Sequence, residues 1–288
     1  MLTGFQPITA MVRLKPTFGV PMKDVTTRLG NCWKRGKFAL SLVLTATLAS
    51  TLPAAAQDAA EPLPSEIQAL ITEIDQAASA ENLEAVMENI SRDFTHADGL
   101  TYSSLQDALE RFWARYDDLT YTTQVDSWER DGDAIVAETT TQVTGTQILD
   151  GRVLQLDSTM RSRQRYVDGK LVEQSTLAED NRVTSGANPP ELSVQLPEQV
   201  LIGQSFAFDA IVTEPLGDRQ LLGTALDEPV TADGYLAETP LEMNLLPAGG
   251  IFKVGRAPAL PEQRWISGII IREDGIVMVT RRVRFETD

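Results

Sequence analysis

Three Asp-Gly pairs, at residues 131–132, 150–151 and 168–169, constrain the fold more than any other feature. They separate four runs in which apolar and polar residues alternate, at residues 119–130, 133–146, 152–167 and 170–180. Alternation with a period of two is typical of a strand with one buried face. Asp-Gly fits the tight turns between antiparallel neighbours because glycine accepts positive φ. The sequence therefore predicts a four-stranded antiparallel meander.

Three amphipathic helices are predicted ahead of the meander. The first opens at Ser65, and its apolar residues recur at helical spacing as far as Ala78. The second spans residues 83–92 with Asn82 as its N-cap, and the third runs from Ser103 or Ser104 to about residue 116. Residues 94–102, between the second and third helices, are predicted to form a loop that turns at residues 98–99.

This order of elements, from Ser65 to about Arg182, resembles the nuclear transport factor 2-like superfamily. That superfamily contains SnoaL-like proteins, ketosteroid isomerase and scytalone dehydratase. The run at residues 82–86, the Asp93-Phe94 pair, the turn at residues 98–99 and the hairpin at residues 128–132 add to the resemblance. It implies an α+β domain over residues 65–182, in which three helices pack into a curved four-stranded sheet and leave a cystatin-like conical pocket. It also implies that the pocket serves catalysis in some members and binding in others, and that this chain forms a homodimer through the sheet.

A second, all-β domain is predicted over residues 191–288. Residues 181–190 are polar and end in two prolines, which is typical of a linker. Beyond them no helical pattern appears, and Pro197, Val200, Gly203 and Phe206 lie in register with the opening of bacterial immunoglobulin-like domains, which this stretch resembles. We expect a β-sandwich, with a smaller barrel as the alternative. Arg281, Arg282 and Arg284 are interpreted as charges that protect the edge of the last strand.

The N-terminal region, residues 1–56, carries the three parts of a secretory signal. Lys34, Arg35 and Lys37 precede an apolar stretch at residues 38–52, and an Ala-rich cleavage site at residues 54–56 precedes Gln57. A membrane anchor would need about 20 apolar residues, and this stretch is shorter and interrupted by hydroxyl residues. The sequence predicts cleavage near residues 56–57, a periplasmic or secreted product and no integral membrane span afterwards. Translation starting at Met1, Met11 or Met22 is compatible with the pattern.

The charge balance argues against nucleic acid as a partner. Residues 1–56 hold seven of the 25 basic residues and one of the 41 acidic ones, so the remaining chain has a net charge near −22. Such an anion is repelled by phosphate backbones and by anionic lipid. The only cysteine, Cys32, lies within the predicted signal, so no disulfide is expected in the product.

No catalytic set stands out in the sequence. The only histidine, His96, lies near Asp98 and Tyr102 in the predicted loop, and these three side chains are the candidates for proton transfer on a small carbonyl compound. The alternative is a solvated loop in which Asp98 belongs to the turn. The strand carboxylates Glu138, Asp157 and Glu173 cannot be oriented from alternation alone. No metal site or cofactor motif is predicted.

Two further sets are candidates for ligand binding. Trp113, Tyr116, Tyr121 and Trp128 are placed to stack on a ring-shaped ligand in the cone, with core packing as the alternative. Arg161, Arg163 and Arg165 alternate along the third strand and project from one face, where they would receive a carboxylate or an acidic partner. The alternative is an exposed face with cross-strand charge pairs.

We therefore expect an exported envelope protein that binds a small molecule or another envelope protein without catalysis. The alternative is a small-molecule lyase or isomerase of the ketosteroid-isomerase or dehydratase type that uses the cone.

Overall fold

The computed structural model describes residues 62–236 and 239–287. The predicted signal peptide and Cys32 lie outside these residues. The N-terminal elements are α1 (Ser65–Ser79), α2 (Leu83–Glu88), β1 (Ile90–His96), α3 (Tyr102–Trp113), β2 (Asp117–Asp131), β3 (Ala134–Leu149), β4 (Arg152–Val167) and β5 (Lys170–Gly186). The C-terminal elements are β6 (Leu192–Gln195), β7 (Gln199–Leu201), β8 (Ser205–Val212), β9 (Leu222–Pro229), η2 (Asp233–Leu236), β10 (Asn244–Leu245), β11 (Gly250–Arg256), β12 (Glu262–Arg272) and β13 (Gly275–Glu286).

The four predicted strands form and pair in sequence order. β2, β3, β4 and β5 are antiparallel neighbours joined at the three Asp-Gly pairs. The turn glycines Gly132, Gly151 and Gly169 all have positive φ, and so do Asp150 and Asp168. These turns match the tight hairpins that Asp-Gly favours.

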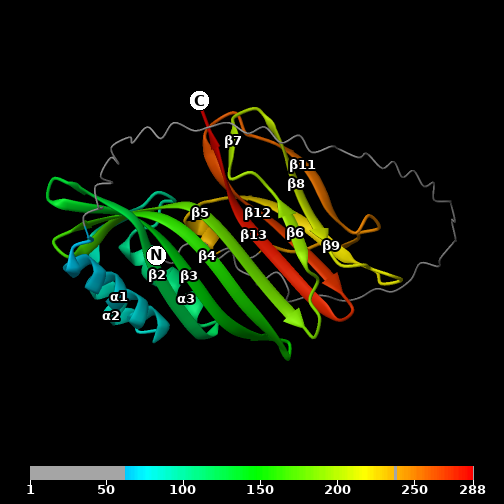
Figure 1. The fold of residues 1–288 in the computed structure, drawn as a ribbon, viewed down its shortest axis with the longest axis horizontal. Coiled ribbons are helices and arrows are strands. Elements are labelled where there is room, and N and C mark those ends of the chain that lie inside the picture. The colour runs from blue at the N-terminus through cyan, green and yellow to red at the C-terminus, as the bar shows by residue number, and fades with distance from the viewer. Residues whose placement is uncertain (1–61, 237–238, 288) are drawn as a thin grey trace, which may run out of the picture. The chain divides into compact units, whose positions relative to one another are not determined.

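The prediction of an α+β domain with its own four-stranded sheet, followed by a separate all-β sandwich, is wrong. The described chain is mostly β, and one ten-stranded sheet runs through both halves in the order β10-β9-β12-β13-β5-β4-β3-β2, with β1 paired to β5 and β7 to β13. Figure 1 shows β13 between β5 and β12. Residues 181–186, predicted as linker, continue β5 and pair with β13. Their polar side chains are accommodated because Asn181 accepts from Ser158 and Ser185 donates to the Val153 carbonyl.

The described C-terminal strands do not form a separate immunoglobulin-like domain. The C-terminal residues instead add β9, β10, β12 and β13 to the shared sheet and place a three-stranded sheet, in the order β11-β8-β6, against it. β13 is therefore an interior strand, so the interpretation of its arginines as edge protection is wrong as well. A pattern of alternating residues reports which face of a strand is buried but not which strands flank it.

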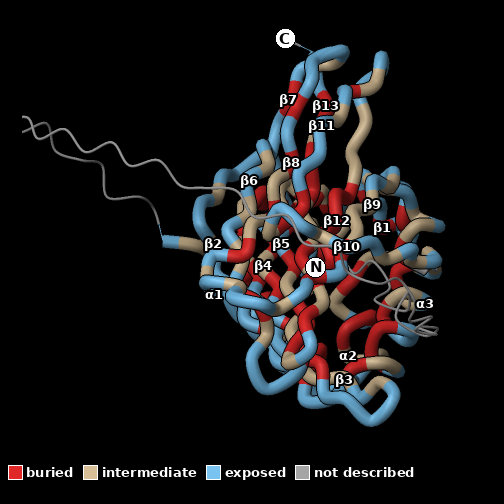
Figure 2. Tube along the Cα trace, turned by 90° about the vertical axis from the view of Figure 1, so that its right-hand side faces the viewer, coloured by how far each residue is buried: buried red, intermediate tan, exposed pale blue. Residues whose placement is uncertain are grey.

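The two faces of the large sheet are covered in different places. The helices bury an apolar cluster against β2–β5, and this cluster includes Ile71, Leu109 and Val183. The three-stranded sheet buries a second cluster, including Phe208, Ile270 and Val277, against the opposite face of β12 and β13. Buried positions accordingly occur in both the helix-bearing part and the C-terminal strands (Figure 2). The outer face of β2–β4 faces solvent.

The second predicted helix is shorter than expected. α2 ends at Glu88, and residues 90–96 form the parallel partner of β5. Ile90, Phe94 and His96 of β1 are buried, while its intervening residues are more exposed. Tertiary pairing therefore overrides the helical spacing that continues to Arg92. Among the described residues, no helix has the length and apolarity needed to span a bilayer.

Candidate functional site

His96 and Asp98 lie in a tight turn between β1 and α3. The His96 amide donates to the Leu100 carbonyl at 3.0 Å, and Gly99, with φ of 89°, donates back to the His96 carbonyl at 2.9 Å. The Asp98 amide donates to Nδ1 of His96 at 3.0 Å. The imidazole is therefore the tautomer with its proton on Nε2, which lies 3.4 Å from the Thr176 hydroxyl. Local hydrogen bonds thus hold the two side chains together.

The Asp98 carboxylate is bound by Arg282, 184 residues further along the chain. Nη1 of Arg282 donates to Oδ1 and Nη2 donates to Oδ2, each at 2.9 Å. The Tyr235 hydroxyl also donates to Oδ2 of Asp98. The Arg282 side chain is 0% exposed and that of Asp98 is 2% exposed. A bidentate pair of this kind is strong and directional, and it ties the β1–α3 turn to the last strand.

Glu179 on β5 completes the network. Its Oε2 accepts from Nε of Arg282 at 3.2 Å and from the Trp265 indole at 3.0 Å, and its Oε1 accepts from Nδ2 of the Asn181 side chain at 2.6 Å. We call Asp98, Glu179, Tyr235, Trp265 and Arg282 the buried ion network. One arginine faces two carboxylates, and both carboxylates have additional donors.

Burial and charge shift the pKa values in this network in opposite directions. Burial raises the pKa of Glu179 to about 7, although Arg282 opposes the shift. Burial also raises the pKa of Asp98, but the charge and hydrogen bonds of Arg282 outweigh it and hold the pKa below its ordinary value. Burial lowers the pKa of His96 to about 3, against the attraction of Asp98. At neutral pH the imidazole is uncharged and, with so low a pKa, a weak general base.

Tyr102 does not join this group. Its hydroxyl donates to the Met87 carbonyl at 3.4 Å, and the guanidinium of Arg92 lies 4.4 Å from the centre of its ring. The structure therefore brings two of the three predicted proton-transfer residues together and places the third elsewhere. Glu138 faces the outer surface, where it lies 3.9 Å from Arg163.

The four aromatic candidates lie on the helix-bearing face. Trp113, Tyr116 and Tyr121 belong to the buried apolar cluster, and Trp128 packs partly buried against it. The Trp113 indole donates to the Tyr121 hydroxyl at 3.0 Å. The ring of Tyr116 packs 4.8 Å from that of Phe112.

The three arginines of β4 project from the outer face, and each lies near a carboxylate. Arg163 contacts Glu129 at 2.9 Å, Arg165 contacts Asp131 at 2.5 Å, and Arg161 lies 3.7 Å from Glu198. The Glu198 contact is different in kind, because Glu198 lies in the segment between β6 and β7 and not on a neighbouring strand of the meander. Arg161 therefore contacts the segment that joins β6 to β7.

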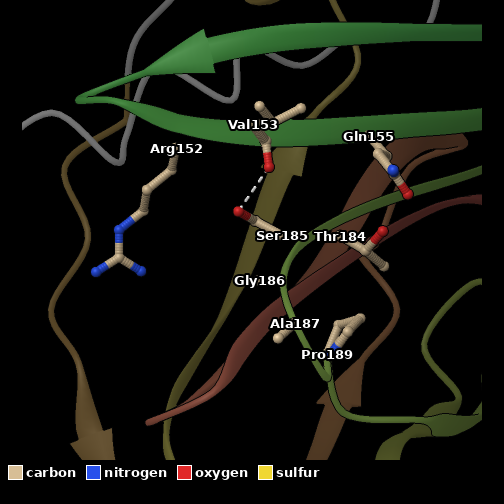
Figure 3. A pocket seen from close by; sticks show the side chains of 8 residues that line it. All are labelled: Arg152, Val153, Gln155, Thr184, Ser185, Gly186, Ala187 and Pro189. Atoms are coloured by element: carbon tan, nitrogen blue, oxygen red, sulfur yellow. Dashed lines mark hydrogen bonds between the residues drawn. The ribbon is translucent and has the colours of Figure 1, made fainter.

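Two pockets on the outer face lie at the two ends of β6. The first, of about 360 Å³, borders the buried ion network at Glu179 and Arg282. Its other lining residues are Thr140, Thr159, Arg161, Ala178, Asp180, Leu196, Pro197, Glu198 and Arg281. The second, of about 520 Å³, is lined by Arg152, Val153, Gln155, Thr184, Ser185, Gly186, Ala187 and Pro189. Figure 3 shows this second pocket, with the start of β4 on one side and the chain that leaves β5 on the other. We call the surface from Pro189 to Glu198 and the β4–β5 face beside it the β6 groove.

Sequence reasoning missed Glu179, Tyr235, Trp265 and Arg282. The only local signal was Arg282 itself, a charge within an apolar strand, and it was assigned to an edge. Among the described residues, no group of three or more His, Cys, Asp and Glu side chains is placed to hold a metal ion.

Comparisons with known proteins each concern only part of the chain. A family model described as a domain of unknown function (DUF8623) matches residues 187–286, a range that begins directly after β5. A search of curated proteins gave no match.

Solved structures similar to this chain cover about two fifths of it. AclR from Streptomyces galilaeus is 22% identical over 39% of this chain and 74% of its own, with a TM-score of 0.32. An LEH-like epoxide hydrolase of M. tuberculosis is 15% identical over 40% of this chain and 84% of its own, with a TM-score of 0.28. A protein with a ketosteroid isomerase-like fold from Catenulispora acidiphila is 16% identical over 37% of this chain and 82% of its own, with a TM-score of 0.28. Because these scores are below 0.5, the account of the fold rests on the chain's own elements.

Proposed function

We propose that this chain is an exported, non-catalytic binding protein that binds its ligand in the β6 groove. The observation that carries the proposal is the contrast between two places in the fold. The His96–Asp98 pair is enclosed and its carboxylate is bound by Arg282, whereas the β6 groove holds two pockets on the outer face.

The chemistry of the pair argues against proton transfer. A general base needs a pKa near the working pH and contact with the substrate. The His96 side chain is 0% exposed and its pKa is lowered to about 3, and Asp98 already accepts from Arg282 and Tyr235. These groups are better suited to holding the two halves of the sheet together.

The groove has the features of a binding surface. Its pockets fall in the volume range of ligand sites, and polar side chains line both. Arg161 and Arg281, each beside a carboxylate, line one end, and Arg152 lines the other. A small molecule or a segment of an envelope protein would find hydrogen-bonding groups along the whole length.

Export is the second part of the proposal, and it rests on residues 34–57 of the sequence. We expect protein recovered from its own cells to begin at or near Gln57 and to be found in the envelope or the medium. N-terminal sequencing by mass spectrometry tests this. An intact N-terminus would contradict export but would leave the groove in place.

Hydrogen-exchange mass spectrometry tests the groove. The purified protein is compared with and without a soluble extract of the envelope fraction, and we expect protection of residues 152–161 and 178–198. Arg161→Ala is expected to weaken the protection, whereas Arg163→Ala, a change of the same kind two residues away on the same face, is not. Protection confined to residues 90–102, with none beside β6, would contradict the proposal.

A further inference from the structure

We infer that the β6 groove takes an extended, acidic peptide segment of a partner protein, which adds a strand to the free edge of β6. This inference rests on the proposed function and names the ligand class for the same surface.

The register of β6 leaves its backbone groups on the groove side without a partner strand. β6 is the edge of the three-stranded sheet and pairs only with β8. The Thr213 amide donates to the Glu191 carbonyl at 3.0 Å, so Glu191, Ser193 and Gln195 face β8. In an antiparallel ladder the alternate residues point away, and the N–H and C=O groups of Leu192 and Val194 therefore face the groove.

One of these groups already accepts a hydrogen bond from a side chain. Nη1 of Arg281 donates to the Val194 carbonyl at 3.2 Å. The same guanidinium binds Asp180, with Nε 2.8 Å from Oδ2. Arg281 thus occupies the place where a donor from an added strand would lie, and such a strand would replace it there.

The two sheets differ in width, and the difference leaves room for a strand. The three-stranded sheet packs over β12 and β13 and ends at β6, whereas the large sheet continues beneath as β5, β4, β3 and β2. The next position beside β6 therefore lies over the outer faces of β5 and β4. The two pockets lie at the two ends of that position. Addition of a strand to a sheet edge is an established way of binding extended peptides.

The groove floor favours carboxylates. Among the described residues, Arg152 and Arg182 have no ion-pair partner within 4 Å, whereas Arg161 and Arg281 are paired with Glu198 and Asp180. Arg182 lies between the two pockets, directly across from Asp157 on β4. The acidic residues Asp157, Asp180 and Glu198 also line this surface. A carboxylate of the ligand is therefore attracted only close to Arg152 and Arg182. The peptide therefore carries a carboxylate near its centre and another at the end that reaches Pro189.

The experiment uses a phage-displayed library of random decapeptides, selected against the full chain. The dissociation constant of a selected peptide is measured by fluorescence anisotropy for the parent and for Val194→Pro. This change removes an N–H that faces the groove and leaves the β6–β8 ladder intact, and we expect roughly tenfold weaker binding or worse. The matched control is Val254→Pro on β11, whose N–H faces the other free edge of the same sheet, and it is expected to bind as the parent does.

Two further measurements keep the inference falsifiable if Val194→Pro does not fold. The amide protons of Leu192 and Val194 are expected to exchange more slowly in the parent when the peptide is added. Arg182→Gln is expected to weaken a peptide with carboxylates and to leave its Glu→Gln counterpart unchanged. Selected peptides that lack carboxylates, or that protect no amide of β6, would overturn the inference.

Other outcomes separate the inference from the proposed function. Protection of the groove by free glutamate or citrate, with no peptide selected, would overturn the added strand and leave the groove as a small-molecule site. Concentration-dependent dimers that protect β6 would assign the edge to a second copy of this chain and also overturn the inference. If neither the envelope extract nor any peptide protects residues 152–161 or 178–198, both the inference and the proposed function fail.

Discussion

Replacement of Arg282 by methionine tests whether the buried ion network holds the two halves of the sheet together. The substitution keeps most of the side-chain volume but leaves Asp98 and Glu179 without their cation in a site where their side chains are 2% and 0% exposed. Removal of one partner from a buried ion pair costs about 3–5 kcal/mol, because the remaining charge is buried without compensation. Tyr235 and Trp265 still donate to the carboxylates, so we expect the lower part of this range, about 3 kcal/mol.

The free energy of unfolding is measured by urea denaturation at neutral pH, with tryptophan fluorescence as the signal. The matched control is Arg163→Met, which breaks a pair whose side chains are 50% and 63% exposed and is expected to cost less than about 1 kcal/mol. Combined with Asp98→Asn, Arg282→Met is expected to cost less than the sum of the two single changes, because the same interaction is removed twice. Equal losses for Arg282→Met and Arg163→Met would refute the reasoning.

Three further predictions concern the pH dependence and the turns. Because the pKa of Glu179 is about 7 in the folded protein and about 4.5 when it is exposed, the folded state binds more protons between these values. This group therefore contributes about 3 kcal/mol of stability at low pH that is lost as pH rises from 4.5 to 7. In urea titrations at a series of pH values, the free energy of unfolding of Glu179→Gln should lack this decrease. An unchanged decrease would assign it to another group. Gly186→Ala should lower the free energy of unfolding by about 1–3 kcal/mol, because φ is 99° and a Cβ would lie 2.5 Å from the Asp274 carbonyl oxygen. Gly151→Ala is the control: φ is also positive there but a Cβ would meet open space, so this change should cost less. Equal costs for the two variants would contradict the steric argument. Asn82→Ala should cost about 1 kcal/mol in the same assay through loss of the cap on the Ala85 amide, and a loss near zero would show that the cap is not needed.

Local patterns in the sequence predicted the local elements. The Asp-Gly turns and the alternation around them predicted β2–β5 to within a few residues at most ends, and helical spacing predicted α1 and α3. Each of these signals reports on residues that are neighbours in the chain or on a face of one element. The same logic extended the second helix to Arg92, because the parallel pairing of residues 90–96 with β5 is not visible locally.

The candidate site was predicted only in part for the same reason. The proximity of His96 and Asp98 follows from a turn within three residues, and the structure brings them together. The partner of Asp98 is 184 residues away, and the strand that carries it lies in the sheet interior only because β5 continues to Gly186. Polar residues beyond 180 indicated a linker, and their hydrogen bonds to β4 are a tertiary property.

The continuous sheet has a practical consequence for anyone who divides this protein for study. A cut at residues 187–191 would separate the matched C-terminal family range from the helices, yet it would strip β5 and β13 of each other and expose two long unpaired edges. Fragments made at that boundary should precipitate or associate with one another when expressed alone, and should recover solubility when the two pieces are produced together.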